Sequence, residues 1–163
     1  MNNINLVEKA SEMKTVAICS KDNKHRYCIR MIWDEEKPKC AIIMSQPSSA
    51  GELLLDQTTM LCRNNAVKNK FGSLSILNLF SQLNSENFAK DKLNLSVILE
   101  ECKKADIVLV AFGRSESHKE EKQQLLELLK VYEDKLYSIV EKPYSHPLSP
   151  ACREWAISKL KCQ

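Results

Sequence analysis

The chain has 163 residues and a formal net charge of +3; this length suits a single domain over residues 1–163, and this charge is too small to indicate a polyanionic partner. Its seven cysteines are scattered without the spacing of zinc ligands, so we expect free thiols in a reducing cytoplasm and no metal or other cofactor. The first residues lack the features of a signal peptide and no apolar stretch approaches the roughly 20 residues that span a bilayer, which predicts a cytoplasmic protein without a membrane partner.

The first part of the chain predicts an antiparallel hairpin at the edge of a sheet. Residues 1–13 are expected to form either a short amphipathic helix or a loosely held arm, because their apolar residues recur at helical spacing. Two strands follow over 15–19 and 25–33, and the turn-forming residues 21–24 join them. The hairpin cations are interpreted as a solvated edge, with phosphate contact as the alternative: Lys21, Lys24, Arg26 and Arg30.

The rest of the chain alternates strands with helices. Short apolar runs without polar alternation predict buried parallel strands over 39–45, 73–79, 106–111 and 135–140. Helical spacing and capping residues predict helices from the Asp56 cap to 69, and over 93–104, 116–132 and 151–160. We therefore predict a three-layer α/β domain with a central four-stranded parallel sheet plus the N-terminal antiparallel hairpin.

Polar or conformationally special residues follow each of the predicted parallel strands. Ligands of open parallel sheets bind outside the carboxyl ends of the strands, so these exits are expected to converge on one site. The candidates are Ser45, Gln46, Pro47 and Ser48 after the first strand, Asn78 at the second, Phe112 and Gly113 after the third, and His146, Leu148 and Ser149 after the fourth.

Several of these segments resemble the uracil-DNA glycosylase superfamily. Residues 146–150 resemble the loop that opens the last helix of these enzymes, and residues 105–114 resemble the strand that ends in their Trp-Gly pair. Other segments resemble a small bacterial family of unknown function that looks like a divergent branch of the superfamily and is often carried on mobile elements: Arg26-Tyr27, Ile32-Trp33-Asp34, Gln46-Pro47-Ser48, Asp56-Gln57-Thr58-Thr59 and Asn78-Leu79-Phe80. The resemblance covers residues 24–155 and implies a uracil-DNA-glycosylase-like fold.

The resemblance implies roles for three residues. His146 matches the histidine that stabilises the uracil anion as the glycosidic bond breaks, a role suited to a hydrogen-bond donor in a dry pocket. Asn78 matches the asparagine that reads the pyrimidine edge, and Leu148 matches the leucine wedge that enters the minor groove when a base is flipped. Each residue also has a structural interpretation: a hydrogen-bonding histidine at a helix start, an asparagine that terminates a strand, and a leucine that packs beneath its loop.

The sequence departs from the glycosylase pattern at the first strand exit. Gln46 stands where active enzymes carry an aspartate or asparagine that positions the attacking water. A glutamine cannot act as a general base at neutral pH, although its amide can orient water. Ser48 and Ser49 stand where uracil-specific members place a bulky aromatic residue that excludes thymine. These departures predict lost or strongly reduced excision of uracil.

We therefore expect a glycosylase-fold pseudoenzyme that acts as a nucleic-acid-related binding or regulatory module, with Arg114, Arg153 and Lys159 available for contacts with DNA phosphates. One alternative is an active hydrolase of an N-glycosidic bond in DNA or in a nucleoside, with His146 stabilising the leaving base and Gln46 orienting water. Another alternative is a decoy that binds DNA-mimic glycosylase-inhibitor proteins.

Overall fold

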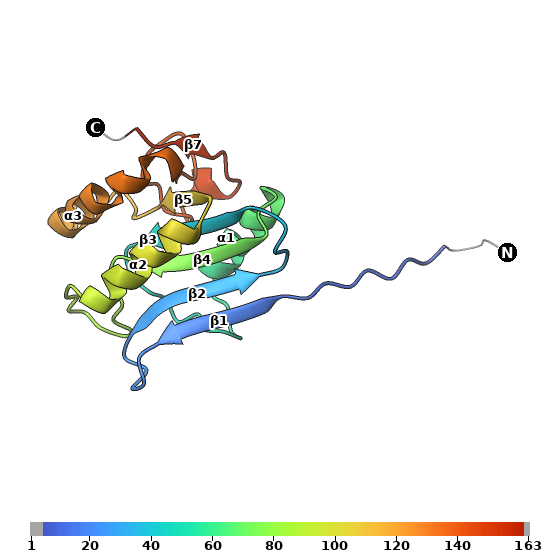
Figure 1. Ribbon diagram of the computed structural model, residues 1–163, viewed down its shortest axis with the longest axis horizontal. Helices are drawn as coiled ribbons and strands as arrows, with labels where there is room; N and C mark the ends of the chain where they lie inside the picture. Colours follow the sequence, from blue (N-terminus) through green and yellow to red (C-terminus); the bar gives the residue numbers. More distant parts are fainter. Residues whose placement is uncertain (1–4, 162–163) are drawn as a thin grey trace.

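The computed structural model describes residues 5–161, and its centre is a seven-stranded mixed sheet in the order β1-β2-β4-β3-β5-β6-β7 (Figure 1). The strands are β1 (Lys14–Cys19), β2 (Arg26–Ile32), β3 (Lys39–Met44), β4 (Ser73–Asn78), β5 (Ile107–Val110), β6 (Leu136–Ser138) and β7 (Ser158–Lys159). Strands β4, β3, β5 and β6 run parallel, so the predicted α/β class and the four parallel strands are confirmed. The sheet is nevertheless larger than four strands, because the hairpin joins it through β2 and β7 extends the opposite edge.

Helices cover both faces of the sheet. They are α1 (Gln57–Lys68), α2 (Lys92–Lys104) and α3 (Lys119–Leu129), with two 3-10 helices at Lys130–Lys135 and Pro150–Cys152. Figure 1 shows α2 and α3 in front of the sheet and α1 behind it. Asp56 caps α1 as predicted, because its carboxylate accepts a hydrogen bond from the Thr59 N–H. The predicted three layers are therefore present.

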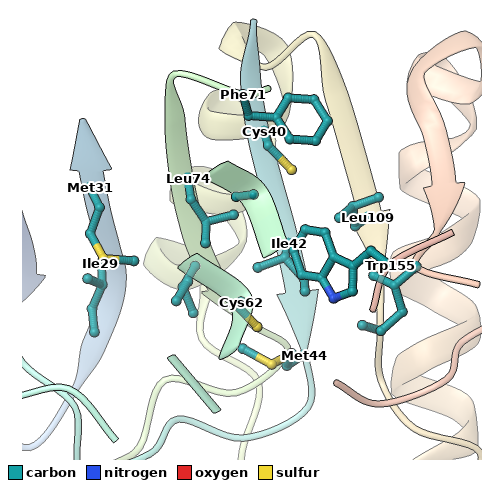
Figure 2. Close-up of a cluster of buried hydrophobic side chains, with 14 of the residues drawn as sticks. Ile29, Met31, Cys40, Ile42, Met44, Cys62, Phe71, Leu74, Leu109 and Trp155 are labelled. Carbon is teal, nitrogen blue, oxygen red and sulfur yellow. The ribbon is translucent and has the colours of Figure 1, made fainter. Parts of the chain in front are cut away.

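The alternation of side chains along β3 divides the core into two parts. Ile42 belongs to the cluster that includes residues of α1 and Trp155, which Figure 2 shows, whereas Ile43 belongs to the cluster with α2 and α3. Both isoleucines are fully buried, which explains why this strand is an unbroken apolar run. A strand buried on both faces leaves only its ends free for binding polar ligands.

The predicted closing helix over 151–160 is wrong. These residues form the 3-10 helix Pro150–Cys152 and then β7, which pairs with β6. Trp155 anchors the segment: its indole is buried in the core, and its backbone N–H donates to the Asn65 side-chain oxygen at 2.9 Å. The Leu160 N–H donates to the Leu136 carbonyl. Pairing with β6 therefore replaces the hydrogen bonds that a helix would have made.

Residues 5–13 take the arm form of the two predicted alternatives. They carry no regular secondary structure, are exposed, and extend away from the sheet (Figure 1); residues 1–4 of the predicted segment lie outside the described residues. The third predicted helix is shorter than 116–132, because α3 begins after His118 and the chain continues from Leu129 as a 3-10 helix. Within residues 5–161, no helix combines the length and the apolar character needed to cross a membrane.

Candidate functional site

A cavity of about 300 Å³ opens at the carboxyl ends of β3 and β4. Its lining comes from the exits of several strands, from the start of β2 and from the first turn of α1: Arg26, Met44, Ser45, Gln46, Pro47, Ser48, Thr58, Asn78 and His146. The structure thus brings Gln46, Asn78 and His146 together, as the strand-end argument predicts. Their role in binding a ligand stays a prediction.

The loop after β3 is held by hydrogen bonds from its neighbours. Ser45 donates its hydroxyl to the Phe112 carbonyl at 2.8 Å, and the Gln46 carbonyl accepts from the Asn78 side chain at 2.8 Å. The Gln46 side chain itself is exposed and forms no hydrogen bond within residues 5–161. The backbone of this loop is therefore fixed, while the Gln46 amide keeps its donors and its acceptor for a ligand.

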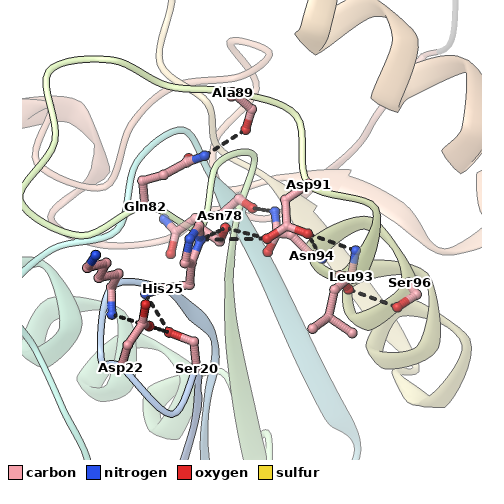
Figure 3. Close-up of polar contacts among 12 residues, drawn as sticks. Ser20, Asp22, His25, Asn78, Gln82, Ala89, Asp91, Leu93, Asn94 and Ser96 are labelled. Atoms are coloured by element: carbon pink, nitrogen blue, oxygen red, sulfur yellow. Dashed lines mark hydrogen bonds and ion pairs between the residues drawn. The ribbon is translucent and has the colours of Figure 1, made fainter.

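Asn78 is the anchor at the end of β4. Its side chain is 2% exposed, donates to the Gln46 carbonyl and accepts from the Arg26 guanidinium at 3.3 Å. Its backbone carbonyl accepts from Asn94 of α2 at 2.9 Å, a contact shown in Figure 3. The structural interpretation of Asn78 as a strand terminator therefore has direct support, and one amide N–H and one lone pair remain for a ligand.

His146 is held as a neutral hydrogen-bond donor. The Leu148 backbone N–H donates to His146 Nδ1 at 3.1 Å, so the ring proton resides on Nε2. Burial lowers the pKa of His146 below its usual value, which also favours the neutral ring. No hydrogen bond to Nε2 occurs within the described residues. This nitrogen can therefore donate to a ligand oxygen in the cavity.

The exit of β5 packs against the histidine loop. Gly113 has a φ of +81°, and a Cβ atom added there would lie 3.7 Å from the His146 Cβ. The Gly113 N–H donates to the Tyr144 carbonyl at 2.8 Å, and Phe112 is buried beside it. A glycine fits this position because its backbone adopts the left-handed region without strain. These two residues therefore support the cavity without lining it.

Arg26 was not among the predicted site residues, and its interpretation as part of a solvated edge is wrong. It is 3% exposed, and its guanidinium donates to the Ser48 and Ala50 carbonyls and to the Asn78 side chain. The cause is the pairing of β2 with β4, in which Ile29 faces Ile76. This register carries Arg26 to the carboxyl end of β4. Strand periodicity shows only a cation at the start of a strand; the signal that could have identified Arg26 is the Arg26-Tyr27 segment that resembles the family of unknown function.

The carboxylate of Asp56 acts electrostatically on Arg26, yet it does not line the cavity. Burial raises the pKa of its carboxyl group, but hydrogen bonds from Ser48 and Thr59 together with the Arg26 charge bring the pKa below its usual value. Burial lowers the pKa of Arg26, and the Asp56 charge opposes that shift. The carboxylate is therefore occupied in holding the loop and the start of α1.

Other predicted site residues lie outside the cavity lining. Ser149 donates its N–H to the His146 carbonyl, and the Leu148 side chain is 48% exposed. Arg114 and Arg153 are exposed. Lys159 lies in β7 at the far edge of the sheet, with its Nζ 4.7 Å from the centre of the Tyr137 ring. The three predicted phosphate-binding cations are thus not part of the cavity.

No three His, Cys, Asp or Glu side chains within residues 5–161 gather in a way that could hold a metal ion.

No curated protein and no solved structure matches the chain significantly. The family model of proteins of unknown function named DUF1643 matches residues 26–148, a span that begins at the buried arginine and ends in the histidine loop. Its description does not mention glycosylases, so that resemblance stays a prediction. Because the match covers most of the sequence, the chain belongs to the DUF1643 family.

Proposed function

We propose that the protein binds a ligand carrying a nucleobase in the cavity at the ends of β3 and β4, on a uracil-DNA-glycosylase-like fold that has lost most or all excision of uracil. The observation that supports this proposal is the gathering of Gln46, Asn78 and a neutral His146 around one cavity. The glycosylase resemblance assigns base-related roles to the same three residues.

The chemistry of these groups suits the edge of a nucleobase. A base edge presents carbonyl oxygens together with N–H groups, and the Gln46 amide can both donate and accept hydrogen bonds. The Nε2–H of His146 can donate to a base carbonyl. Because the loop backbone and the Asn78 side chain are already fixed by internal bonds, ligand binding has to order the Gln46 side chain but not the loop backbone.

The same lining argues against efficient excision. No carboxylate lines the cavity among the described residues, and Asp56 is occupied by Ser48 and Thr59. A water molecule in the cavity would therefore be oriented without being deprotonated. Loss of general-base help typically costs on the order of 10²–10⁴ in rate.

Binding and excision assays test this proposal. We expect the protein to bind nucleosides or their phosphates, with His146→Ala and Gln46→Ala each weakening binding about two- to twelvefold, as loss of one hydrogen bond predicts. Gln123→Ala, at an exposed glutamine of α3, is the matched control and leaves affinity unchanged. On uracil-containing oligonucleotides, abasic sites should not accumulate above background.

Two outcomes would overturn the proposal. The first is robust strand cleavage after alkaline treatment that disappears in His146→Ala, which would establish the active hydrolase in place of a pseudoenzyme. The second is the absence of binding to any nucleobase, nucleoside or nucleotide by a correctly folded protein.

A further inference from the structure

Arg26 is a buried positive charge with no carboxylate of the described residues at ion-pair distance, and the Asp56 charge acts on it from farther away. Its side chain is 3% exposed, and none of the ion pairs within residues 5–161 includes it. A buried charge is costly unless it is paired. Arg30, the other arginine of β2, differs from Arg26 because it donates from two nitrogens to the carboxylate of Glu101.

The guanidinium also has unused hydrogen-bond donors. Of its five N–H groups, two on Nη1 donate to the Ser48 and Ala50 carbonyls and one on Nη2 donates to Asn78. The Nε–H is buried and has no partner within the described residues. All three of the acceptors are uncharged, so they satisfy donors without neutralising the charge.

The remaining surroundings of the cavity also favour a negative group. His146 presents an N–H donor, and Thr58 lies in the first turn of α1, where the helix dipole is positive. Asp56 opposes this preference, but its charge is already stabilised by Ser48, Thr59 and Arg26. The lining of the cavity itself contains one formal positive charge and no formal negative charge among the described residues.

We propose that the ligand of this cavity is anionic and that Arg26 recognises its phosphate monoester, so that the protein binds a nucleoside monophosphate in preference to the nucleoside. The nucleobase part of this inference rests on the proposed function. The cavity is lined by the exposed Gln46 and by the buried Arg26, so one ligand can meet both the free amide and the guanidinium. A phosphate monoester offers the guanidinium three terminal oxygens and more than one negative charge, whereas a phosphodiester carries a single charge.

Titration calorimetry with the full chain tests the inference. The probes are the four common ribonucleosides, their 5′-monophosphates and inorganic phosphate, at a fixed salt concentration of about 50 mM. We expect at least one monophosphate to bind at least about tenfold more tightly than its nucleoside, the effect of one charge-assisted hydrogen bond. Inorganic phosphate is expected to compete with that nucleotide.

Charge variants locate the phosphate. Arg26→Gln should abolish the advantage of the monophosphate over the nucleoside, and Arg26→Lys should keep part of it because the charge remains. Arg63→Gln is the matched control: it removes the same charge from α1, where the guanidinium contacts the neighbouring Asn64, and leaves the affinity ratio unchanged. Circular dichroism verifies that each variant is folded. If Arg26→Gln does not fold, the affinity ratio of the wild-type protein decides the question.

The outcomes separate this inference from the proposed function. Equal affinity for a nucleoside and its monophosphate overturns the phosphate site and leaves the nucleobase cavity standing. Binding of inorganic phosphate that depends on Arg26, without any preference for nucleotides over phosphate, supports the anion site and overturns the nucleobase proposal. Absence of binding to every probe overturns both.

Discussion

Replacement of Asn78 by alanine distinguishes an anchor from a base-reading side chain. The wild-type side chain is 2% exposed and bonds to the Gln46 carbonyl at 2.8 Å and to the Arg26 guanidinium at 3.3 Å. A neutral hydrogen bond contributes about 0.5–1.5 kcal/mol and a bond to a charged group about 1.5–3 kcal/mol. Because truncation removes both hydrogen bonds and leaves the Arg26 guanidinium buried, we expect the free energy of unfolding to fall by about 2–4 kcal/mol.

Urea denaturation measures this loss, provided that the slope of the free energy of unfolding against urea concentration is the same in the variant and the wild-type protein. Asn64→Ala is the control, because Asn64 is exposed on α1 and its truncation should change stability by less than about 0.5 kcal/mol. A loss below about 0.5 kcal/mol in Asn78→Ala, together with weakened ligand binding, would refute the anchor role and support direct reading of the base.

Three further predictions concern the cavity and its frame. Gln46→Asp introduces a carboxylate that could act as a general base beside the cavity. Measurable excision of uracil by this variant, absent from the wild-type protein, would show that the rest of the site is competent. If the variant is also inactive, the site lacks more than a general base. Gly72→Ala would place a Cβ 1.8 Å from the Asp34 carbonyl oxygen, so thermal unfolding should show that the free energy of unfolding falls by about 1–3 kcal/mol. Gly51→Ala is the control and should leave the stability nearly unchanged, because no atom lies within 4 Å of the added Cβ. His146 has a folded-state pKa below its usual value of 6.5. As the pH falls, the His146 ring is therefore protonated in the unfolded chain before it is protonated in the folded protein. The stability that depends on this residue is present above pH 6.5 and is lost as the pH falls below it. Comparison of wild type with His146→Gln across this pH range measures that contribution, and a contribution that grows as the pH falls would contradict the assignment of a neutral ring.

The strand ends that build the cavity were predictable because their signals are local. Unbroken apolar runs identified β3, β4, β5 and β6 as parallel strands, and parallel strands bring their carboxyl ends to one edge. Gln46 and Asn78 follow from that rule alone, since each stands at such an end. His146 lies eight residues beyond the end of β6; the strand-exit rule already includes it among the candidates, and the glycosylase resemblance adds only its expected role.

The parts that were missed depend on contacts between distant residues. The position of Arg26 follows from the register between β2 and β4, which no pattern within the hairpin encodes. The end of the chain has helical spacing, yet Trp155 is held by Asn65, a residue 90 positions earlier. Local propensity gives way there to burial of an indole and to pairing with β6.

A crystal structure of the protein with a tightly binding nucleoside monophosphate tests the central claim most directly. The account predicts density in the cavity, with a base oxygen within hydrogen-bond distance of His146 Nε2, the base edge beside Gln46, and the phosphate facing Arg26. An empty cavity at saturating nucleotide, or a nucleotide bound elsewhere on the molecule, would contradict it.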